Sequence, residues 1–382
     1  MEVVVPKKEL LRLVARCQGV ADKKSAMPAL SNVLLSAEGN ALHVSATDLF
    51  LAMTGQTPAE VTVAGSVAVP ARELHERIKA MPDGPLQITT TAGAQTTIKS
   101  LASPRRFTLP GVPGSEFPQL PKADPDAPKL SLSVDLIARL FGRTYFSIST
   151  DETRAHVNSA LFEWSGDRVR MVTTDGHRLS KMEATVDGSS ATATMLIPLK
   201  AVSELHRLAD DARNEPRDTK SDARPQVAIT QSGPNAFFDI AGMRFSVKLV
   251  DAQFPPYQQV IPKASERSLR AARKALAEAL DAVRIAASDR SGGVKLTTLP
   301  GVLRITSESP ESGHGFDEIP IDYEGSEMTI GFNAKYFLDV LGALDDDEII
   351  LGVSGELDPA TVRPANESEH ESYVAVVMPM RI

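Results

Sequence analysis

The residue types best suited to chemistry gather in one short stretch, Thr173-Thr174-Asp175-Gly176-His177-Arg178-Leu179. A carboxylate and an imidazole two positions apart could act as an acid–base pair. Asp-Gly at the end of a strand is, however, more typical of a turn. Because the stretch has no nucleophile in a recognised setting, we interpret Asp175 and His177 as turn residues and not as catalytic ones.

Other reactive motifs are missing from the sequence. No Gly-x-Ser-x-Gly, Walker A or His-Glu-x-x-His motif occurs, and the seven histidines include no pair at metal-ligand spacing. The one cysteine, Cys17, falls on the apolar stripe of a predicted helix, and a lone cysteine excludes an intrachain disulfide and a cysteine-based zinc site. We expect a protein without catalytic activity, cofactor or metal.

The charge and composition bound the class of protein. Lys and Arg number 41 and Asp and Glu number 49, so the net charge is −8. This excludes a uniformly basic nucleic-acid binder but leaves room for a locally basic surface. No run of 18 apolar residues occurs, and the N-terminus shows no apolar signal-peptide region. We therefore expect a cytoplasmic protein.

The elements that must position these residues recur three times along the chain. Two alternating apolar runs joined by a turn, which predict a β-hairpin, occupy 30–53, 157–182 and 292–311. A strand end followed by an amphipathic helix occupies 69–82, 197–210 and 331–345. Connections with a Phe-Pro pair close the first two units at 107–122 and 245–263, and further helix patterns fall at 6–17, 133–145 and 268–286.

The spacing of these elements indicates three equal copies of one α+β unit. Asp48 and Asp175 lie 127 positions apart, which is about one third of 382 residues. We predict domains at 1–127, 128–253 and 254–382. The polar stretch 210–226 breaks the period and is interpreted as a surface loop.

Cations concentrate on five of the six repeat helices, although the chain is acidic. Lys and Arg solvate any exposed helix face, but their recurrence over three repeats favours one basic surface that attracts phosphates without reading sequence. In the helix predicted at 268–286, Leu269 is expected to face inward and Arg270 outward. The other expected outward cations are Arg12, Arg16, Arg72, Lys79, Arg139, Arg143, Lys200 and Lys274.

The last ten residues, 373–382, form an apolar strand pattern that ends in Met378-Pro379-Met380-Arg381-Ile382. Chain ends are usually polar and frayed, so methionines here suggest an adaptable docking surface. A terminal strand of the core is the alternative interpretation.

Four motifs closely resemble the bacterial β sliding clamp family: TDGHRL at 174–179, FPPYQQVIP at 254–262, GFNAKY at 331–336 and VVMPMRI at 376–382. The resemblance covers the whole chain. It implies three similar domains and a head-to-tail homodimer that closes as a ring around duplex DNA, with helices lining the hole and sheets outside. Such a protein is a non-catalytic subunit that gives DNA polymerase III its processivity.

The resemblance also implies a groove for a partner peptide of the form Gln-Leu-x-Leu-Phe. The expected partners are the polymerase alpha subunit, the clamp loader, and repair polymerases, ligase and mismatch-repair proteins. Apolar pockets would hold the Leu and Phe, while polar groups orient the Gln. The implied groove residues are Val157, Thr174, Gly176, His177, Arg178, Leu179, Pro255, Gln259, Val260, Asn333, Tyr336, Val376, Val377, Met378, Pro379, Met380 and Arg381.

The same resemblance implies DNA contacts and a dimer joint. Lys24, Arg154 and His156 match family positions near DNA, with a tyrosine in the family where this chain has His156. At the joint, Phe107 and Leu109 would face Ile285 of a second copy, and Arg105 and Arg106 would meet Glu308 and Glu311. In the family, Gln259 is often Arg, and an aromatic residue stands where this chain has Ser291. The main alternative is a clamp-fold interaction scaffold that does not encircle DNA.

Overall fold

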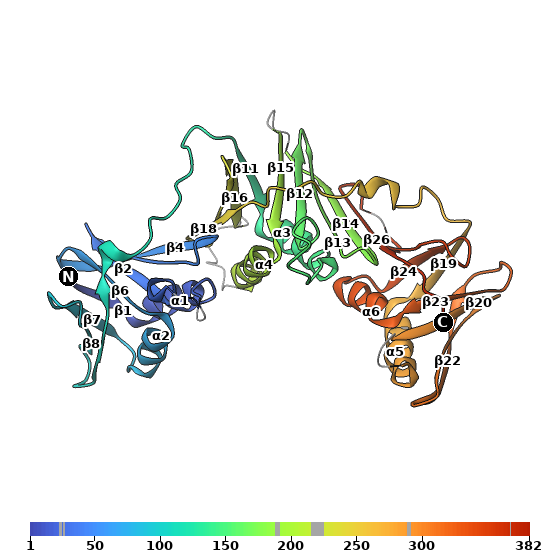
Figure 1. The fold of residues 1–382 in the computed structure, drawn as a ribbon, viewed down its shortest axis with the longest axis horizontal. Coiled ribbons are helices and arrows are strands. Elements are labelled where there is room, and N and C mark those ends of the chain that lie inside the picture. The colour runs from blue at the N-terminus through green and yellow to red at the C-terminus, as the bar shows by residue number, and fades with distance from the viewer. Residues whose placement is uncertain (23–24, 26, 188–191, 215–224, 289–291, 367) are drawn as a thin grey trace. The chain divides into compact units, whose positions relative to one another are not determined.

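All three predicted hairpins form, and each continues into a third antiparallel strand. Figure 1 labels the three strands of the middle copy, β12 (Ser159–Ser165), β13 (Arg168–Thr174) and β14 (Arg178–Thr185). A computed structural model describes residues 1–22, 25, 27–187, 192–214, 225–288, 292–366 and 368–382. Within it the chain divides into two units. Unit 1 comprises Met1–Ile137 and Ser203–Leu249, and unit 2 comprises Ala138–Val202 and Val250–Ile382. Lys24, Ser291 and residues 215–224 lie outside the described residues.

Unit 1 is built on two sheets. The larger has nine strands in the order β10 (Val112–Pro113), β6 (Gly65–Pro70), β2 (Asn32–Glu38), β3 (Ala41–Thr47), β4 (Leu51–Pro58), β18 (Met243–Lys248), β17 (Asn235–Ile240), β16 (Gln226–Ser232) and β11 (Lys129–Ser133). The smaller has five, in the order β5 (Glu60–Val63), β1 (Glu2–Pro6), β7 (Pro85–Thr90), β8 (Thr96–Ser100) and β9 (Arg106–Leu109). The pairing of β4 with β18 joins two repeats, because these strands come from the first and the second copy.

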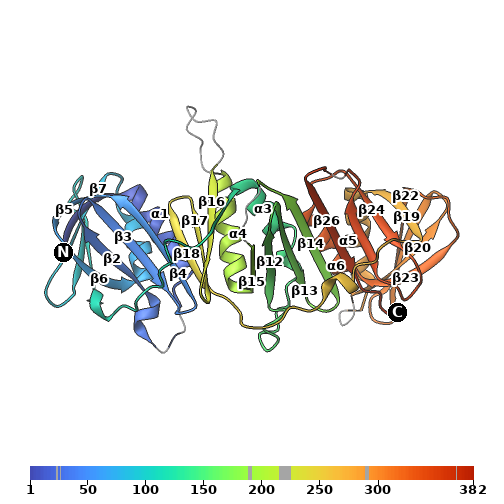
Figure 2. The same cartoon turned by 90° about the horizontal axis from the view of Figure 1, so that it is seen from above.

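Two helices of unit 1 bury the apolar stripes that the sequence predicts. Helix α1 (Lys7–Gln18) packs against β3 and β4, and α2 (Ala71–Ala80) packs against α1 and β6. Leu10, Leu13 and Cys17 of α1 are fully buried. Figure 2 shows α1 behind the strands of this sheet. Both helices follow a proline. Proline suits the start of a helix because the backbone N–H groups there have no hydrogen-bond acceptor within the helix, so its missing N–H costs nothing.

Unit 2 contains a twelve-stranded antiparallel sheet. Its order is β15 (Thr192–Pro198), β12 (Ser159–Ser165), β13 (Arg168–Thr174), β14 (Arg178–Thr185), β26 (Glu371–Val377), β25 (Ala360–Pro364), β24 (Glu348–Val353), β19 (Arg267–Ala272), β22 (Gly313–Asp322), β21 (Val302–Ser309), β20 (Gly293–Leu299) and β23 (Met328–Asn333). Helices α5 (Arg273–Val283) and α6 (Ala334–Ala343) pack against each other (Figure 1). The pairing of β14 with β26 again joins two repeats.

Two predicted boundaries are wrong. The helix expected at 268–286 begins only at Arg273, because 267–272 is strand β19 with Leu269 buried and Arg270 exposed in strict alternation. The loop expected at 210–226 is helical as far as Asn214, since α4 (Leu199–Asn214) continues past the predicted end, and β16 begins at Gln226. Helix α3 (Val134–Gly142) lies within its predicted range. No described helix is long and apolar enough to cross a membrane.

Candidate partner-binding groove and nucleic-acid-facing residues

The Thr-Asp-Gly-His-Arg stretch is a turn between β13 and β14, and its own polar groups fix its shape. The Asp175 carboxylate accepts hydrogen bonds from the backbone N–H of His177 at 2.9 Å and of Arg178 at 3.0 Å. Thr174 Oγ1 accepts from the Gly176 N–H at 3.1 Å and donates to the Arg178 carbonyl at 2.7 Å. Gly176 has φ +94°, a conformation that favours glycine. These contacts confirm the interpretation of Asp175 and His177 as turn residues.

The C-terminal tail lies directly beside this turn. In β26, Val377 pairs with Arg178 and Val376 with Leu179, and both valines are fully buried. Beyond the strand, the Met378 N–H donates to the His177 carbonyl at 2.9 Å. The alternative interpretation, a core strand, is therefore confirmed as far as Val377. Met378 to Met380 are half-buried, and their role as a docking surface stays a prediction.

A glycine in β23 makes room for the tail. The Met380 N–H donates to the Gly331 carbonyl at 2.8 Å. A Cβ placed on Gly331 would lie 2.5 Å from the Met380 carbonyl oxygen and 2.8 Å from the Ile382 side chain. Any side chain at this position would have to displace the tail.

The N-terminus of α6 lies beside the 174–178 turn and the C-terminal tail. Asn333 caps the helix by accepting the Lys335 N–H at 2.9 Å. The Tyr336 ring stacks on the His177 ring, with centroids 6.4 Å apart and planes 16° apart. Burial, together with the nearby Asp175 and Asp339 carboxylates, raises the pKa of Tyr336 despite the opposing Arg178 cation. The ring is therefore a neutral phenol at physiological pH.

Arg178 connects the turn to α6 and is almost fully buried. Its guanidinium bonds to the Asp175 carboxylate at 3.0 Å, to Asp339 at 2.6 Å and to the Phe146 carbonyl. It also lies 4.7 Å from the centroid of the Tyr336 ring. The sequence motifs did not single out Asp339. The sequence offered one indication that Asp339 lies near the groove residues: it follows Tyr336 by three positions on a predicted helix, and residues at that spacing share a helix face.

The Phe-Pro connection lies over an apolar row on the sheet. That row comprises Leu161, Val172, Leu179, Leu196, Val374 and Val376, with Tyr257 above it and Val250, Phe254 and Ile261 packed against it. Tyr257 is 4% exposed, and its hydroxyl donates to Glu163 at 3.0 Å and accepts from Arg170 at 3.0 Å. Burial raises the pKa of Tyr257, against the effect of Arg170. The connection is thus anchored, while Val260 beyond it remains 42% exposed.

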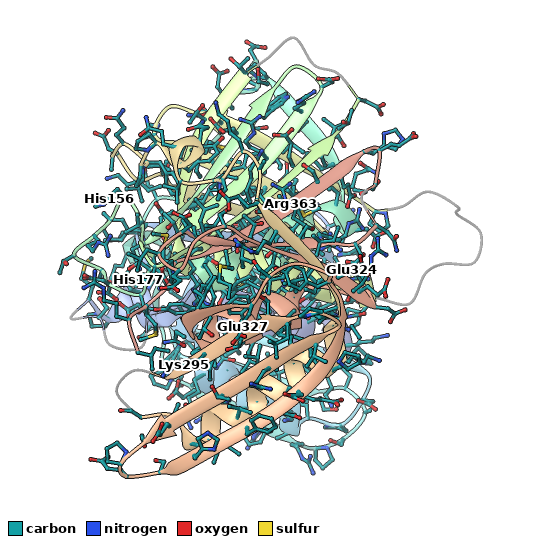
Figure 3. The ribbon with its side chains drawn as sticks, turned by 90° about the vertical axis from the view of Figure 1, so that its right-hand side faces the viewer. His156, His177, Lys295, Glu324, Glu327 and Arg363 are labelled. Carbon is teal, nitrogen blue, oxygen red and sulfur yellow. The ribbon has the colours of Figure 1, made fainter. Side chains whose placement is uncertain are left out.

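The structure divides the predicted groove residues into surface and support. Buried residues that form the support are Val157, Arg178, Leu179, Val376 and Val377. Half-buried or exposed residues are Thr174, Gly176, His177, Pro255, Gln259, Val260, Asn333, Tyr336, Met378, Pro379, Met380 and Arg381. A cavity of about 570 Å³ adjoins the turn and includes the missed residues Tyr145, Phe146 and Asp339 in its lining. Figure 3 shows His156 and His177 toward the same side of unit 2.

Three of the cations expected to face DNA are corrected by the structure. Arg16 is 4% exposed and donates to the Ala241 carbonyl at 3.1 Å. Arg139 forms a two-point ion pair with Glu371, and Arg143 lies 3.7 Å from Asp346 with its side chain 14% exposed. Each of these guanidiniums is held by another segment of its own unit.

The other cations on that expected surface reach solvent to different extents. Arg12 is half-buried and paired with Glu9, and His156 is half-buried. Arg72, Lys79, Arg154, Lys200 and Lys274 are exposed.

The residues expected at a dimer joint lie at two places in the chain, one in each unit. Phe107 is half-buried on β9, the last strand of its sheet, whereas Leu109 is 1% exposed. Leu109 as a joint contact is therefore corrected: it packs inside its own unit. In unit 2, Ile285 is 78% exposed, and β22 pairs with β19 only through Ile321 and Asp322.

The charged residues expected at the joint are all exposed: Arg105, Arg106, Glu308 and Glu311.

Comparison with known proteins covers the full chain. Three family models of the DNA polymerase III beta subunit match this chain. The model of the N-terminal domain matches residues 1–121, that of the central domain matches residues 131–256, and that of the C-terminal domain matches residues 258–381. A beta sliding clamp of Caulobacter vibrioides is 30% identical over 390 residues, and one of Pseudomonas putida is 31% identical over 385, with both chains fully covered.

Solved structures agree with this match. The DNA polymerase III subunit beta of Pseudomonas aeruginosa superposes with a TM-score of 0.90 at 30% identity over all of both chains. A sliding clamp of Bartonella birtlesii bound to griselimycin has a TM-score of 0.90 at 31% identity, again over all of both chains.

Proposed function

Because this chain belongs to the DNA polymerase III beta subunit family, the bacterial β sliding clamps, we propose that two copies close head to tail into a ring around duplex DNA. The chain has three repeated clamp domains and is a non-catalytic sliding clamp. One observation carries the tethering role: the turn at 174–178, the N-terminus of α6 and the C-terminal tail converge in one place. These are three of the four motifs by which the sequence resembles the family.

The groove is proposed to take a Gln-Leu-x-Leu-Phe segment in extended form. Val260, Met378 and Met380 are proposed to supply adaptable apolar surface, and Leu179 and Val376 supply the buried support. Asn333 and His177 supply polar groups at the edge, where a glutamine side chain can bond. The proposed occupants are segments of the polymerase alpha subunit, the clamp loader, repair polymerases, ligase and mismatch-repair proteins.

DNA is proposed to be held by shape and charge without sequence readout. The five exposed cations Arg72, Lys79, Arg154, Lys200 and Lys274 support this, because solvent-exposed ammonium and guanidinium groups attract phosphates of any sequence. They also argue against an interaction scaffold that no longer encircles DNA. No single cation is expected to dominate. We place the protein in the cytoplasm, on the nucleoid.

The ring joint is proposed to pair the open edge of β9 with the open edge of β22 from a second copy. Unpaired strand edges invite pairing, and a closed ring removes them. Phe107 and Ile285 supply apolar contact, and Phe316 on β22 is 56% exposed. Arg105 and Arg106 with Glu308 and Glu311 add ion pairs worth about 0–1 kcal/mol each.

The decisive experiment is topological. Purified protein loaded on nicked circular DNA should stay bound at high salt and slide off once the circle is cut to a linear form. Release from circular DNA at the same rate as from linear DNA would exclude encirclement. A peptide titration on the same preparation tests the groove separately.

A further inference from the structure

We infer that Asp339 of α6 is a positioning residue that holds the 174–178 turn against α6 through Arg178 and thereby sets affinity for the partner peptide. The inference rests on the proposed function of the groove. Asp339 is absent from the residues that the family motifs imply, and its role comes from contacts within unit 2.

Asp339 lies beside the turn, where it contacts Arg178 and Lys335 and lines the adjoining cavity. Its carboxylate lies 2.6 Å from Arg178 Nη1 and 2.8 Å from Lys335 Nζ, and its side chain is 23% exposed. Arg178, at 9% exposure, bonds in addition to Asp175 of the turn and to the Phe146 carbonyl. One guanidinium therefore joins the turn, the segment after α3 and helix α6.

The first repeat contains the same turn and serves as an internal comparison. Thr47 Oγ1 accepts from the Leu49 N–H at 3.0 Å and donates to the Leu51 carbonyl at 2.7 Å. The Asp48 carboxylate accepts from the N–H groups of Phe50 at 2.9 Å and Leu51 at 2.6 Å. The Lys248 N–H donates to the Phe50 carbonyl at 2.8 Å, as Met378 does to His177. All five hydrogen bonds thus recur.

The arginine itself does not recur. Leu51, which is 2% exposed, occupies the position of Arg178 in the first repeat. Leu49 adopts φ +76° where the second repeat has Gly176 at φ +94°. The turn can therefore form without an arginine, so the Arg178–Asp339 ion pair is not needed for its local fold. What the ion pair adds is a fixed distance between the turn and α6.

That fixed distance has a direct effect on the groove surface. His177 stacks on Tyr336 only while the turn is held against α6, and the His177 carbonyl also holds the Met378 N–H. When the ion pair is removed, the turn keeps its own hydrogen bonds but shifts relative to Tyr336. The peptide then binds only the fraction of molecules in the competent arrangement, which raises the apparent Kd by the reciprocal of that fraction.

The test compares Asp339→Asn with the wild-type full-length protein. A fluorescein-labelled Gln-Leu-Ala-Leu-Phe peptide is titrated by anisotropy and its association rate measured by stopped flow. We expect Asp339→Asn to raise Kd about tenfold, mainly through slower association, and Asp339→Glu to restore part of the loss. Lys335→Met is the matched control, because it removes the other partner of Asp339, and it should bind as wild type does.

A second measurement does not depend on the peptide. Hydrogen exchange of the Met378 amide should quicken in Asp339→Asn, while the exchange of buried α6 amides stays unchanged. Wild-type affinity with unchanged Met378 exchange in Asp339→Asn would overturn the inference. So would exchange that quickens throughout α6, since that marks a merely structural role. Failure of the wild-type protein to bind the peptide would instead refute the proposed groove, while the exchange data still decide the role of Asp339.

Discussion

Removal of Met378 to Ile382 should disable the proposed partner groove while leaving strand β26 in place. The strand keeps its pairing with β14 from Glu371 to Val377, so the sheet should survive. The groove loses three half-buried side chains and the two hydrogen bonds that the Met378 and Met380 amides donate. One wall disappears, and the floor of buried valine and leucine remains.

The size of the effect follows from how few groups a short peptide buries. Its Leu and Phe each gain about 1.5–3 kcal/mol when fully buried, so the loss of one wall should remove roughly half of their sum. A loss of about 1.5–3 kcal/mol corresponds to a tenfold to 150-fold rise in Kd. Fluorescence anisotropy with the labelled peptide measures this directly.

The control must separate the groove from the joint. Ile382 lines the same cavity as Glu308 and His314, so the end of the tail reaches the strands that carry a predicted joint residue. A shorter truncation that removes only Arg381 and Ile382 keeps the Met378 and Met380 contacts and should retain most of the peptide affinity. Both truncations should remain dimeric by light scattering. Unchanged peptide affinity in a dimeric five-residue truncation would refute the groove assignment.

Further predictions concern the joint, the cations and the lone cysteine. Phe107→Ala should give monomers by light scattering at an unchanged melting temperature, whereas Leu109→Ala should lower stability by about 2–5 kcal/mol in a denaturant titration because it leaves a cavity in the core. A dimeric Phe107→Ala protein would place the joint elsewhere. Arg154→Ala together with Lys274→Ala should weaken salt-dependent DNA binding equally for all sequences, while Arg16→Ala should lower the melting temperature and leave DNA binding unchanged. Burial raises the pKa of Cys17 from 9.0 to about 12, despite the nearby Arg207 and Arg16 cations, so maleimide labelling of the folded protein should stay slow at pH 9. Because the folded state holds this proton more tightly, the free energy of unfolding gains from Cys17 below pH 9 and loses that gain between pH 9 and 12, which urea titrations at several pH values would reveal.

The sequence predicted the repeated elements well because hydrophobic periodicity is a local signal. The three hairpins, the buried stripe of α1 and the Asp175 turn all depend on neighbouring residues, and all are confirmed. Strand β19 was misassigned for the same reason. Six residues are too few to separate a period of 2 from one of 3.6, and Leu269 lies seven positions before Leu276, so it also fits the apolar stripe of the helix that follows.

The wrong predictions at the sites arise where segments distant in the sequence determine whether a side chain is exposed. Nothing near Arg16 in the sequence shows that the Ala241 carbonyl, 225 positions away, will accept its hydrogen bond. Arg139 likewise looks like an outward cation until Glu371 packs beside it. The polar face of a helix shows only that these side chains do not point into the core against which the helix's apolar face packs. Which second segment covers it is tertiary information, and Asp339 was missed for that reason.

The glycine at position 331 has a consequence for how this surface can vary. Residue 331 need not touch any partner, yet a methyl group there would collide with the backbone of the tail. Alanine scanning measures what is lost when a side chain on the binding surface is truncated. A scan of the groove would therefore omit Gly331, which has no side chain and matters because it has none. A substitution at Gly331 should therefore impair binding of a partner peptide in the proposed groove, while every residue on the proposed binding surface stays the same. Selection experiments for loss of partner binding should include this position for that reason.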